Sequence, residues 1–283
     1  MIEKKFDAGE VVLNYAEGPD NGPPLILLHG VSGNWRFLSP IIRTTANNWH
    51  VYALDQRGHG KSGKTPGHYL LKDYASDLTK FIEEKVTEPV VLLGHSLGGM
   101  VSTIISGTHR EKARALIVGD SLLNIDSRAT YKRVNNNKPL REAFKNIYNL
   151  TSSNLTSHEI AGKLSGYPMK ADTRLYSKYL GSLDADTMGA WVEAFGSYDS
   201  YVRMMEGYDC GSLFREMGCP VLLVQSDASQ GGILTDDDVR YISSVHPDTC
   251  LIRLAGLGHD MGLDVGSVDW VHAPLSHFLY SLL

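Results

Sequence analysis

A serine flanked by small residues stands where a buried strand is expected to end. The segment 94–99, Gly-His-Ser-Leu-Gly-Gly, follows the apolar run 90–93 and precedes a predicted helix over 100–108. In a Gly-x-Ser-x-Gly turn between strand and helix, the glycines allow close backbone approach and the turn exposes the serine oxygen. The helix N-terminus favours the negative charge that develops there. The context predicts Ser96 as a nucleophile, whereas His95, in the variable position, is expected to pack.

This nucleophile needs a base, because a serine hydroxyl is weakly nucleophilic by itself. The chain has 11 histidines, and His259 lies in the segment 254–260, between the last predicted strand and the last predicted helix. A histidine in that loop can reach back over the strand ends. Its place after Ser96 agrees with the chain order serine, acid, histidine. We therefore expect His259 to be the base; the alternative is a loop histidine bonded to backbone.

Acyl transfer also needs hydrogen-bond donors for the oxyanion. The backbone N–H of Leu97, directly after the nucleophile, is one candidate. The other is expected in the loop 29–33, His-Gly-Val-Ser-Gly, where Val31 follows the His-Gly pair. Only the backbone takes part, so the valine side chain is no objection. Trp35 follows this loop, which borders the reacting centre, and is predicted to bind substrate.

The predicted nucleophile, base and amide donors can lie close together only if the strands before them end at the same edge of a sheet. Six apolar runs end in glycine or polar turns and do not alternate with polar residues, which is typical of strands covered on both faces. Amphipathic stretches lie between them, for example over 69–86, and over 268–283 with Pro274 interrupting or starting the helix. The alternation predicts an α/β fold with a doubly wound, mostly parallel sheet. The segments 4–6 and 11–15 predict an antiparallel hairpin at its edge. The predicted buried strands cover residues 25–28, 51–54, 90–93, 115–118, 221–224 and 250–254.

The alternation of strands and helices fails in the middle of the chain. This stretch has helical periodicity, with breaks at 166–168 and 181. We therefore expect a helical cap, 122–208, over the strand ends of a core domain formed by 1–121 and 209–283. Aromatic and Met residues gather in its C-terminal part, where most are expected to form the insertion's own core and some an apolar pocket. They are Trp191, Phe195, Tyr198, Tyr201, Met204, Met205 and Tyr208.

Four motifs together resemble the α/β-hydrolase superfamily. They are Leu-His-Gly at 28–30, Asp-Gln-Arg-Gly-His-Gly-Lys-Ser at 55–62, Gly-His-Ser-Leu-Gly-Gly at 94–99 and Gly-His at 258–259. The resemblance covers nearly the whole chain, and the insertion matches the family's variable cap. It is specific for the superfamily and not for the reaction. The resemblance implies an α/β-hydrolase fold, supports the nucleophile, the base and both amide donors, and makes the second motif a structural turn.

The acid that orients the base has two candidates. The resemblance implies a usual place a few residues past the strand 221–224, where Asp227 stands two residues earlier than the family pattern and Ser229 occupies the expected slot. Some dehalogenase-like relatives place the acid at the end of the preceding core strand, about two dozen residues after the nucleophile. Asp120 stands 24 positions after Ser96 (120 − 96). Geometry rather than sequence identifies a triad, so Asp120 is favoured and Asp227 stays open.

The composition argues against several classes of function. The 283 residues carry a net charge of −5 and no long basic run, which argues against nucleic-acid binding. No apolar run approaches the length of a membrane span and no signal-like segment opens the sequence, so we expect a cytoplasmic protein without a membrane partner. The three cysteines form no CxxC pair, which argues against a zinc cluster or a disulfide framework. No cofactor or metal is expected, and no oligomeric state is indicated.

The leading hypothesis is a serine hydrolase that cleaves a carboxylic ester of a small, fairly apolar molecule through an acyl-enzyme. A serine nucleophile argues against dehalogenase and epoxide hydrolase chemistry, which uses an aspartate in relatives. Lactonase, thioesterase, amidase, carbon–carbon bond hydrolase and perhydrolase activities stay open on the same residues. The alternative from another class is a non-enzymatic ligand receptor that retains the triad.

Overall fold

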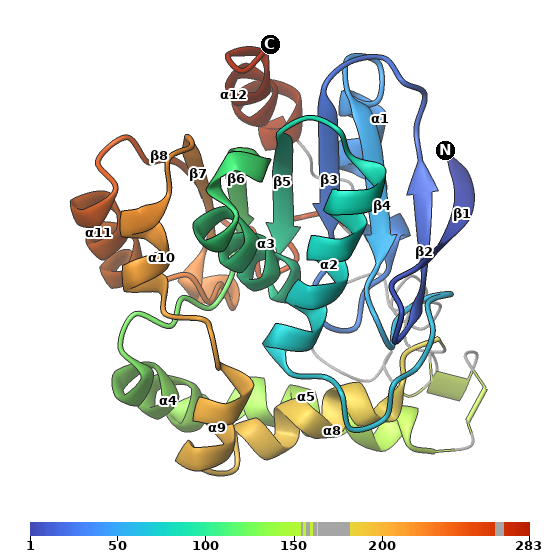
Figure 1. Ribbon diagram of the computed structural model, residues 1–283. Helices are drawn as coiled ribbons and strands as arrows, with labels where there is room; N and C mark the ends of the chain where they lie inside the picture. The colour runs from blue at the N-terminus through green and yellow to red at the C-terminus, as the bar shows by residue number, and fades with distance from the viewer. Residues whose placement is uncertain (154, 157–158, 161–162, 164–181, 264–268) are drawn as a thin grey trace.

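A single sheet organises the molecule. The computed structural model describes residues 1–283 apart from 154, 157–158, 161–162, 164–181 and 264–268. The sheet has eight strands in the order β1-β2-β4-β3-β5-β6-β7-β8 (Figure 1). β1 and β2 pair antiparallel with their neighbours, and the other pairs are parallel. The predicted mostly parallel α/β sheet is therefore confirmed, including its edge hairpin. The strands are β1 (Ile2–Asp7), β2 (Val12–Glu17), β3 (Pro24–Leu28), β4 (His50–Asp55), β5 (Val90–His95), β6 (Ala113–Gly119), β7 (Val221–Ser226) and β8 (Cys250–Leu254).

Both faces of the sheet are covered, because successive residues of a strand point to opposite faces. In β3, Leu25 and Leu27 belong to one buried apolar cluster, whereas Ile26 and Leu28 belong to another. This explains why the central strands read as continuous apolar runs. The run 250–254 is the exception: it forms β8 at the edge of the sheet, where only Leu254 is buried, so its prediction as a strand covered on both faces was wrong. Helices α1 (Ser39–Thr45) and α12 (Ser276–Tyr280) pack in the first cluster. Helices α2 (Leu71–Lys85), α3 (Leu97–Thr108), α10 (Cys210–Glu216) and α11 (Asp236–Val245) pack in the second.

Four further described helices contact one another and lie beyond the carboxyl ends of the parallel strands (Figure 1). They are α4 (Ser127–Asn136), α5 (Lys138–Thr151), α8 (Ala185–Ala194) and α9 (Tyr198–Met204). All fall within 122–208, and the described part of this segment contains no strand, as its periodicity predicts. The boundaries of a cap domain stay a prediction. The expected breaks at 166–168 and 181 lie outside the described residues.

The C-terminal helix is irregular at Pro274. Residues Val271–Leu275 form one turn of π-helix, η4, and α12 follows it directly. Proline has no backbone N–H and clashes with the preceding turn, so a regular α-helix cannot continue through it. The interruption predicted at this proline is therefore confirmed.

Candidate active site

Ser96 lies at the turn between β5 and α3. Its backbone has φ 52° and ψ −116°, which a residue with a Cβ adopts only under strain. Two hydrogen bonds hold this conformation. The Ser96 N–H donates to the Gly119 carbonyl at 2.9 Å, and the Ser121 hydroxyl donates to the Ser96 carbonyl at 2.9 Å. The turn therefore fixes the serine at the carboxyl end of β5, in the middle of the sheet.

The glycines around Ser96 are required by close contacts. A Cβ on Gly94 would lie 2.1 Å from the Gly98 carbonyl oxygen, and a Cβ on Gly98 would lie 2.4 Å from a carbonyl oxygen of β3. A Cβ on Gly99 would lie 1.9 Å from the hydroxyl oxygen of Ser121. Sequence reasoning missed the support that Ser121 provides. Its one signal in the sequence is the third glycine, which leaves room for that hydroxyl.

The structure brings Ser96, His259 and Asp120 together. The His259 Nε2 atom lies 3.1 Å from Ser96 Oγ, and its Nδ1 atom lies 2.7 Å from Asp120 Oδ2. A neutral imidazole with its proton on Nδ1 satisfies both contacts, since it donates to the carboxylate and accepts from the hydroxyl. This arrangement can remove the serine proton during attack on a carbonyl group.

Asp120 is fully buried and its carboxylate is held by more than the histidine. It accepts hydrogen bonds from the backbone N–H groups of Ser226 at 3.2 Å, Ile233 at 3.0 Å and Leu234 at 3.2 Å. Such donors offset the large cost of burying a carboxylate. Its backbone φ is +35°, a strained value that places the residue in a sharp turn after β6. Sequence reasoning could not find these supports, because backbone amides leave no side-chain signal.

The other candidate acid, Asp227, lies in the turn after β7 and does not contact His259. Its carboxylate accepts hydrogen bonds from the N–H groups of Ser229 at 2.8 Å and Gly256 at 2.9 Å. The Gly256 and Ser229 hydrogen bonds lower the pKa of this carboxyl. Asp227 therefore fastens the turn after β7 to the turn after β8, while the structure pairs the base with Asp120.

The two backbone amides predicted to bind an oxyanion have no acceptor within the described part of the chain. Among the residues that the structure describes, no acceptor receives the N–H of Leu97, in the first turn of α3, or the N–H of Val31. The two segments are joined, because the Gly98 N–H donates to the His29 carbonyl at 3.2 Å. The buried His29 ring accepts from the Gln56 N–H at 3.1 Å and has a structural place, as expected.

The comparison with protein families identifies the chain. The model of the alpha/beta hydrolase family matches residues 25–269. The chain belongs to this family. The match spans the strands and turns that carry Ser96, Asp120 and His259.

Similar proteins agree with this assignment. The chain is 25% identical over 265 residues to 2-(acetamidomethylene)succinate hydrolase of Mesorhizobium japonicum, covering 92% of this chain and 89% of that protein. A crystal structure of E-2-(acetamidomethylene)succinate hydrolase superposes with a TM-score of 0.76 at 20% identity, covering 99% of both chains. A thermophilic esterase from Thermogutta terrifontis superposes with a TM-score of 0.72 at 17% identity, covering 100% of this chain and 99% of that one. The structural likenesses establish the fold.

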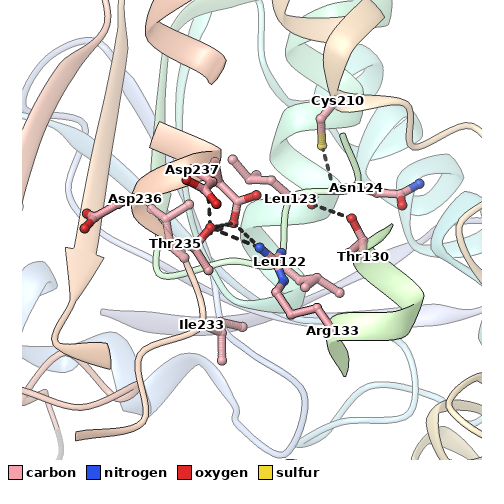
Figure 2. A network of polar contacts seen from close by, with 12 residues as sticks. Leu122, Leu123, Asn124, Thr130, Arg133, Cys210, Ile233, Thr235, Asp236 and Asp237 are labelled. Atoms are coloured by element: carbon pink, nitrogen blue, oxygen red, sulfur yellow. Dashed lines mark hydrogen bonds and ion pairs between the residues drawn. The ribbon is translucent and has the colours of Figure 1, made fainter. Parts of the chain in front are cut away.

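In this alpha/beta hydrolase, the chain enters and leaves the helical segment through one polar cluster. The Asn124 N–H donates to Cys210 Sγ at 3.2 Å, and the Asn124 side chain donates to the Tyr208 carbonyl at 3.0 Å. Figure 2 shows Cys210 pointing at Asn124. Burial raises the pKa of the Cys210 thiol to about 12, so the thiol is not a nucleophile near neutral pH. The aromatic and Met residues predicted to form the insertion's own core are buried, but they join the apolar cluster on one face of the sheet instead of a separate core, and Tyr198 packs partly buried against it. The buried members are Trp191, Phe195, Tyr201, Met204, Met205 and Tyr208.

A second contact joins α4 to the loop that supports Asp120. The Arg133 guanidinium donates to Thr235 Oγ1 at 3.0 Å and to Asp238 Oδ2 at 2.8 Å (Figure 2). Thr235 follows Leu234, whose N–H binds the Asp120 carboxylate. The helical segment is therefore tied to the same short loop that holds the acid.

Trp35 is not brought to the triad. Its backbone N–H donates to Asp55 Oδ1 at 2.8 Å, and its indole N–H donates to Glu3 Oε1 at 3.0 Å. The Arg36 guanidinium lies 4.4 Å from the centre of the indole ring. The indole therefore packs toward β1, and a substrate-binding role of Trp35 stays a prediction. Helix η1 (Trp35–Leu38) follows the loop 29–33 directly, and the Asn34 side chain caps it by accepting the Arg36 N–H at 3.0 Å.

The described residues include no group of three or more His, Cys, Asp or Glu side chains arranged to hold a metal ion. Within the same residues, no helix is long and apolar enough to cross a membrane.

Proposed function

We propose that this chain is a serine hydrolase that cleaves a carboxylic ester of a small, fairly apolar substrate through an acyl-enzyme. The observation that carries the proposal is the line of hydrogen bonds from Ser96 through His259 to the buried carboxylate of Asp120, at 3.1 Å and 2.7 Å. A serine that is exposed to water on a protein surface lacks a paired histidine and carboxylate. A serine that is activated by such a pair can attack a carbonyl carbon.

In the proposed reaction, Ser96 Oγ attacks the ester carbonyl while His259 Nε2 takes the hydroxyl proton. Asp120 holds the imidazole in one tautomer and stabilises the imidazolium that forms. The N–H groups of Leu97 and Val31 donate to the oxyanion, and His259 returns the proton to the leaving alcohol. Water then attacks the acyl-enzyme by the same steps, which releases the acid and restores the serine. Every group used comes from the chain, so the mechanism needs no metal or cofactor.

The surroundings of Val31 support an apolar substrate. The Val31 side chain packs against the main apolar core of the sheet and also against a smaller buried cluster of the helical segment. That cluster contains Leu150, Ile160, Leu183 and Met188. The proposed oxyanion loop is therefore bordered by hydrocarbon side chains, which favour an apolar acyl or alcohol group.

The proposal is tested by labelling and turnover. We expect a fluorophosphonate probe to label the protein and short-chain aryl esters to be turned over many times per chain. Ser96→Ala should lose both, because among the described residues Ser96 has the only hydroxyl that is paired with His259. Ser106→Ala is the matched control. Its hydroxyl is buried in α3, has no hydrogen-bond partner in the described part of the chain, and its loss should leave activity unchanged. Labelling that persists in Ser96→Ala would reject the nucleophile. Fewer than one product per chain would favour the non-enzymatic receptor.

A second candidate reaction is cleavage of an amide by the same residues. It is favoured by the similarity over 92% of the chain to a protein named 2-(acetamidomethylene)succinate hydrolase, because the compound in that name carries an acetamide group. The two candidates differ in the leaving group, because an amine must be protonated more fully than an alcohol as it leaves. Comparing kcat/KM for an aryl acetate and the matching acetanilide separates them. A higher value for the anilide would replace the ester proposal.

A further inference from the structure

We propose that His95 is a positioning residue that holds the backbone of the base His259 and separates it from the oxyanion loop. This inference rests on the proposed function. It starts from a fully formed contact: His95 Nε2 lies 2.7 Å from the carbonyl oxygen of His259. No role for a residue at this variable position of the elbow follows from the sequence pattern, which predicts packing alone.

The His95 ring fills the space between the two loops that carry the proposed chemistry. On one side its centre lies 4.8 Å from the centre of the His259 ring. On the other side, a Cβ on Gly30 would lie only 2.8 Å from His95 Nδ1, so the oxyanion loop passes directly against the imidazole. The ring of Phe37 lies 5.2 Å away and completes the enclosure. A change in the size of this side chain would therefore move the base relative to Val31.

The protonation state of His95 follows from its surroundings. Burial lowers the pKa of His95 to about 4, so the ring is neutral near pH 7. A neutral imidazole has one N–H, and a carbonyl oxygen can only accept, so the proton is on Nε2 and points at His259. The other ring nitrogen, Nδ1, is buried and has no hydrogen-bond partner among the residues that the structure describes. A neutral ring also suits a neighbour that becomes positively charged during catalysis, because a second cation at this distance would oppose the proton transfer.

The loop that carries His259 depends on this contact. Residues 255–260 are all at least partly exposed. The start of the loop is held by Asp227, through the Gly256 N–H at 2.9 Å and the Leu257 carbonyl at 2.8 Å. Beyond His259 the loop is anchored through Met261, whose carbonyl accepts the Trp270 indole N–H at 3.0 Å. The backbone of His259 itself is held by His95, from the elbow that also carries Ser96. One residue of the elbow thus holds the backbone of the base, while Asp120 holds its ring.

The test uses the full chain and three substitutions that separate the N–H donor from the volume of the ring. His95→Gln places an amide N–H near the position of Nε2, His95→Asn places it near Nδ1, and His95→Phe keeps a ring without a donor. We expect kcat for a short aryl ester to fall on the order of 10- to 100-fold in His95→Phe and His95→Asn, since small misplacements of catalytic groups cost this much. KM should stay within about threefold, and His95→Gln should retain kcat within about threefold.

A second measurement does not depend on turnover. The downfield proton resonance of His259 Nδ1–H, which donates to Asp120, should shift or broaden in His95→Asn and stay in place in His95→Gln. Thermal melting shows whether each variant folds. If His95→Phe does not fold, the comparison of His95→Gln with His95→Asn still tests the proposal. Equal kcat values and equal resonances in the Gln and Asn variants would overturn the proposal. A wild-type protein without any turnover rejects the proposed function instead, and the resonance then still tests the positioning.

Discussion

The turns after β6 and β7 each contain an aspartate, and the two aspartates have opposite surroundings. Asp120 follows β6 with a backbone φ of +35°, is fully buried and contacts His259. Asp227 follows β7 with φ −70°, is partly exposed and binds backbone N–H groups of two turns. The two carboxyl groups start from neighbouring strands. An aspartate directly after a strand is therefore not enough to meet the base: the sharp turn at Asp120 buries its carboxylate beside His259, whereas the turn at Asp227 leaves its carboxylate partly exposed.

The two turns also depend on each other. The Asp227 carbonyl accepts the Gly232 N–H at 3.0 Å, which closes the loop after β7. The next two residues of that loop, Ile233 and Leu234, donate to the Asp120 carboxylate. The turn that contains Asp227 therefore acts as the support of Asp120, through backbone amides rather than through its own side chain.

The largest expected effect separates the two acids. Asp120→Asn should lower kcat by on the order of 10³-fold or more, because an amide fails to hold the imidazole tautomer that accepts the serine proton. Asp227→Asn should keep kcat within about threefold, since its side chain contacts only the turns. Steady-state kinetics of both variants with one ester checks this. The reverse ranking would assign the acid to the turn after β7.

A smaller effect is expected where the helical segment meets the supporting loop. Arg133→Gln removes the ion pair with Asp238 and the hydrogen bond to Thr235, so the loop that holds Asp120 should loosen. We expect a loss of about 1–2 kcal/mol in stability and a fall in kcat of about three- to tenfold. Denaturant unfolding measures the change in the free energy of unfolding, and steady-state kinetics measures the change in kcat. Lys132→Gln, at an exposed position of the same helix, is the matched control and should change neither. Equal behaviour of both variants would show that α4 does not influence the acid.

The smallest effect concerns pH. The pKa of Asp227 is lowered by the Gly256 and Ser229 hydrogen bonds, so its ionised form favours the folded state. That contribution is present above the unfolded pKa near 3.9 and is lost as pH falls through the lower folded value. At pH 6 the Tm of the wild type should therefore exceed that of Asp227→Asn by up to about 2 °C. This difference in Tm should shrink below pH 4. A difference that grows in acid would contradict the assigned hydrogen bonds.

Much of the fold could be predicted because its signals are local in sequence. The apolar runs of β3 to β7 indicated buried strands, since both faces of the sheet are covered there. The run 250–254 did form a strand, but β8 is the edge of the sheet and only Leu254 is buried, so its prediction as a buried strand was wrong. The glycines near Ser96 indicated a tight turn, and the close contacts of Gly94, Gly98 and Gly99 are the steric reason. The location of His259 at the same edge of the sheet as Ser96 could also be predicted, because the carboxyl ends of parallel strands lie at one edge.

Other features had no local signal. The side chain of Trp35 points to Glu3 of β1, which no spacing near the oxyanion loop could indicate. The supports of Asp120 are backbone amides of residues 226, 233 and 234, and any residue but proline supplies such an amide. The contact from His95 to His259 was invisible for the same reason, because its acceptor is a backbone carbonyl.

The sequence by itself determined the mostly parallel sheet, the strained turn at Ser96 and the loop that presents His259. These depend on short-range sterics and on apolar periodicity, which act over a few residues. Only the tertiary structure decided that Asp120 rather than Asp227 contacts His259, and that His95 binds the backbone of the base. Those contacts join residues 139 and 164 positions apart. Their formation depends on the direction of each turn after its strand, which packing of the whole sheet sets.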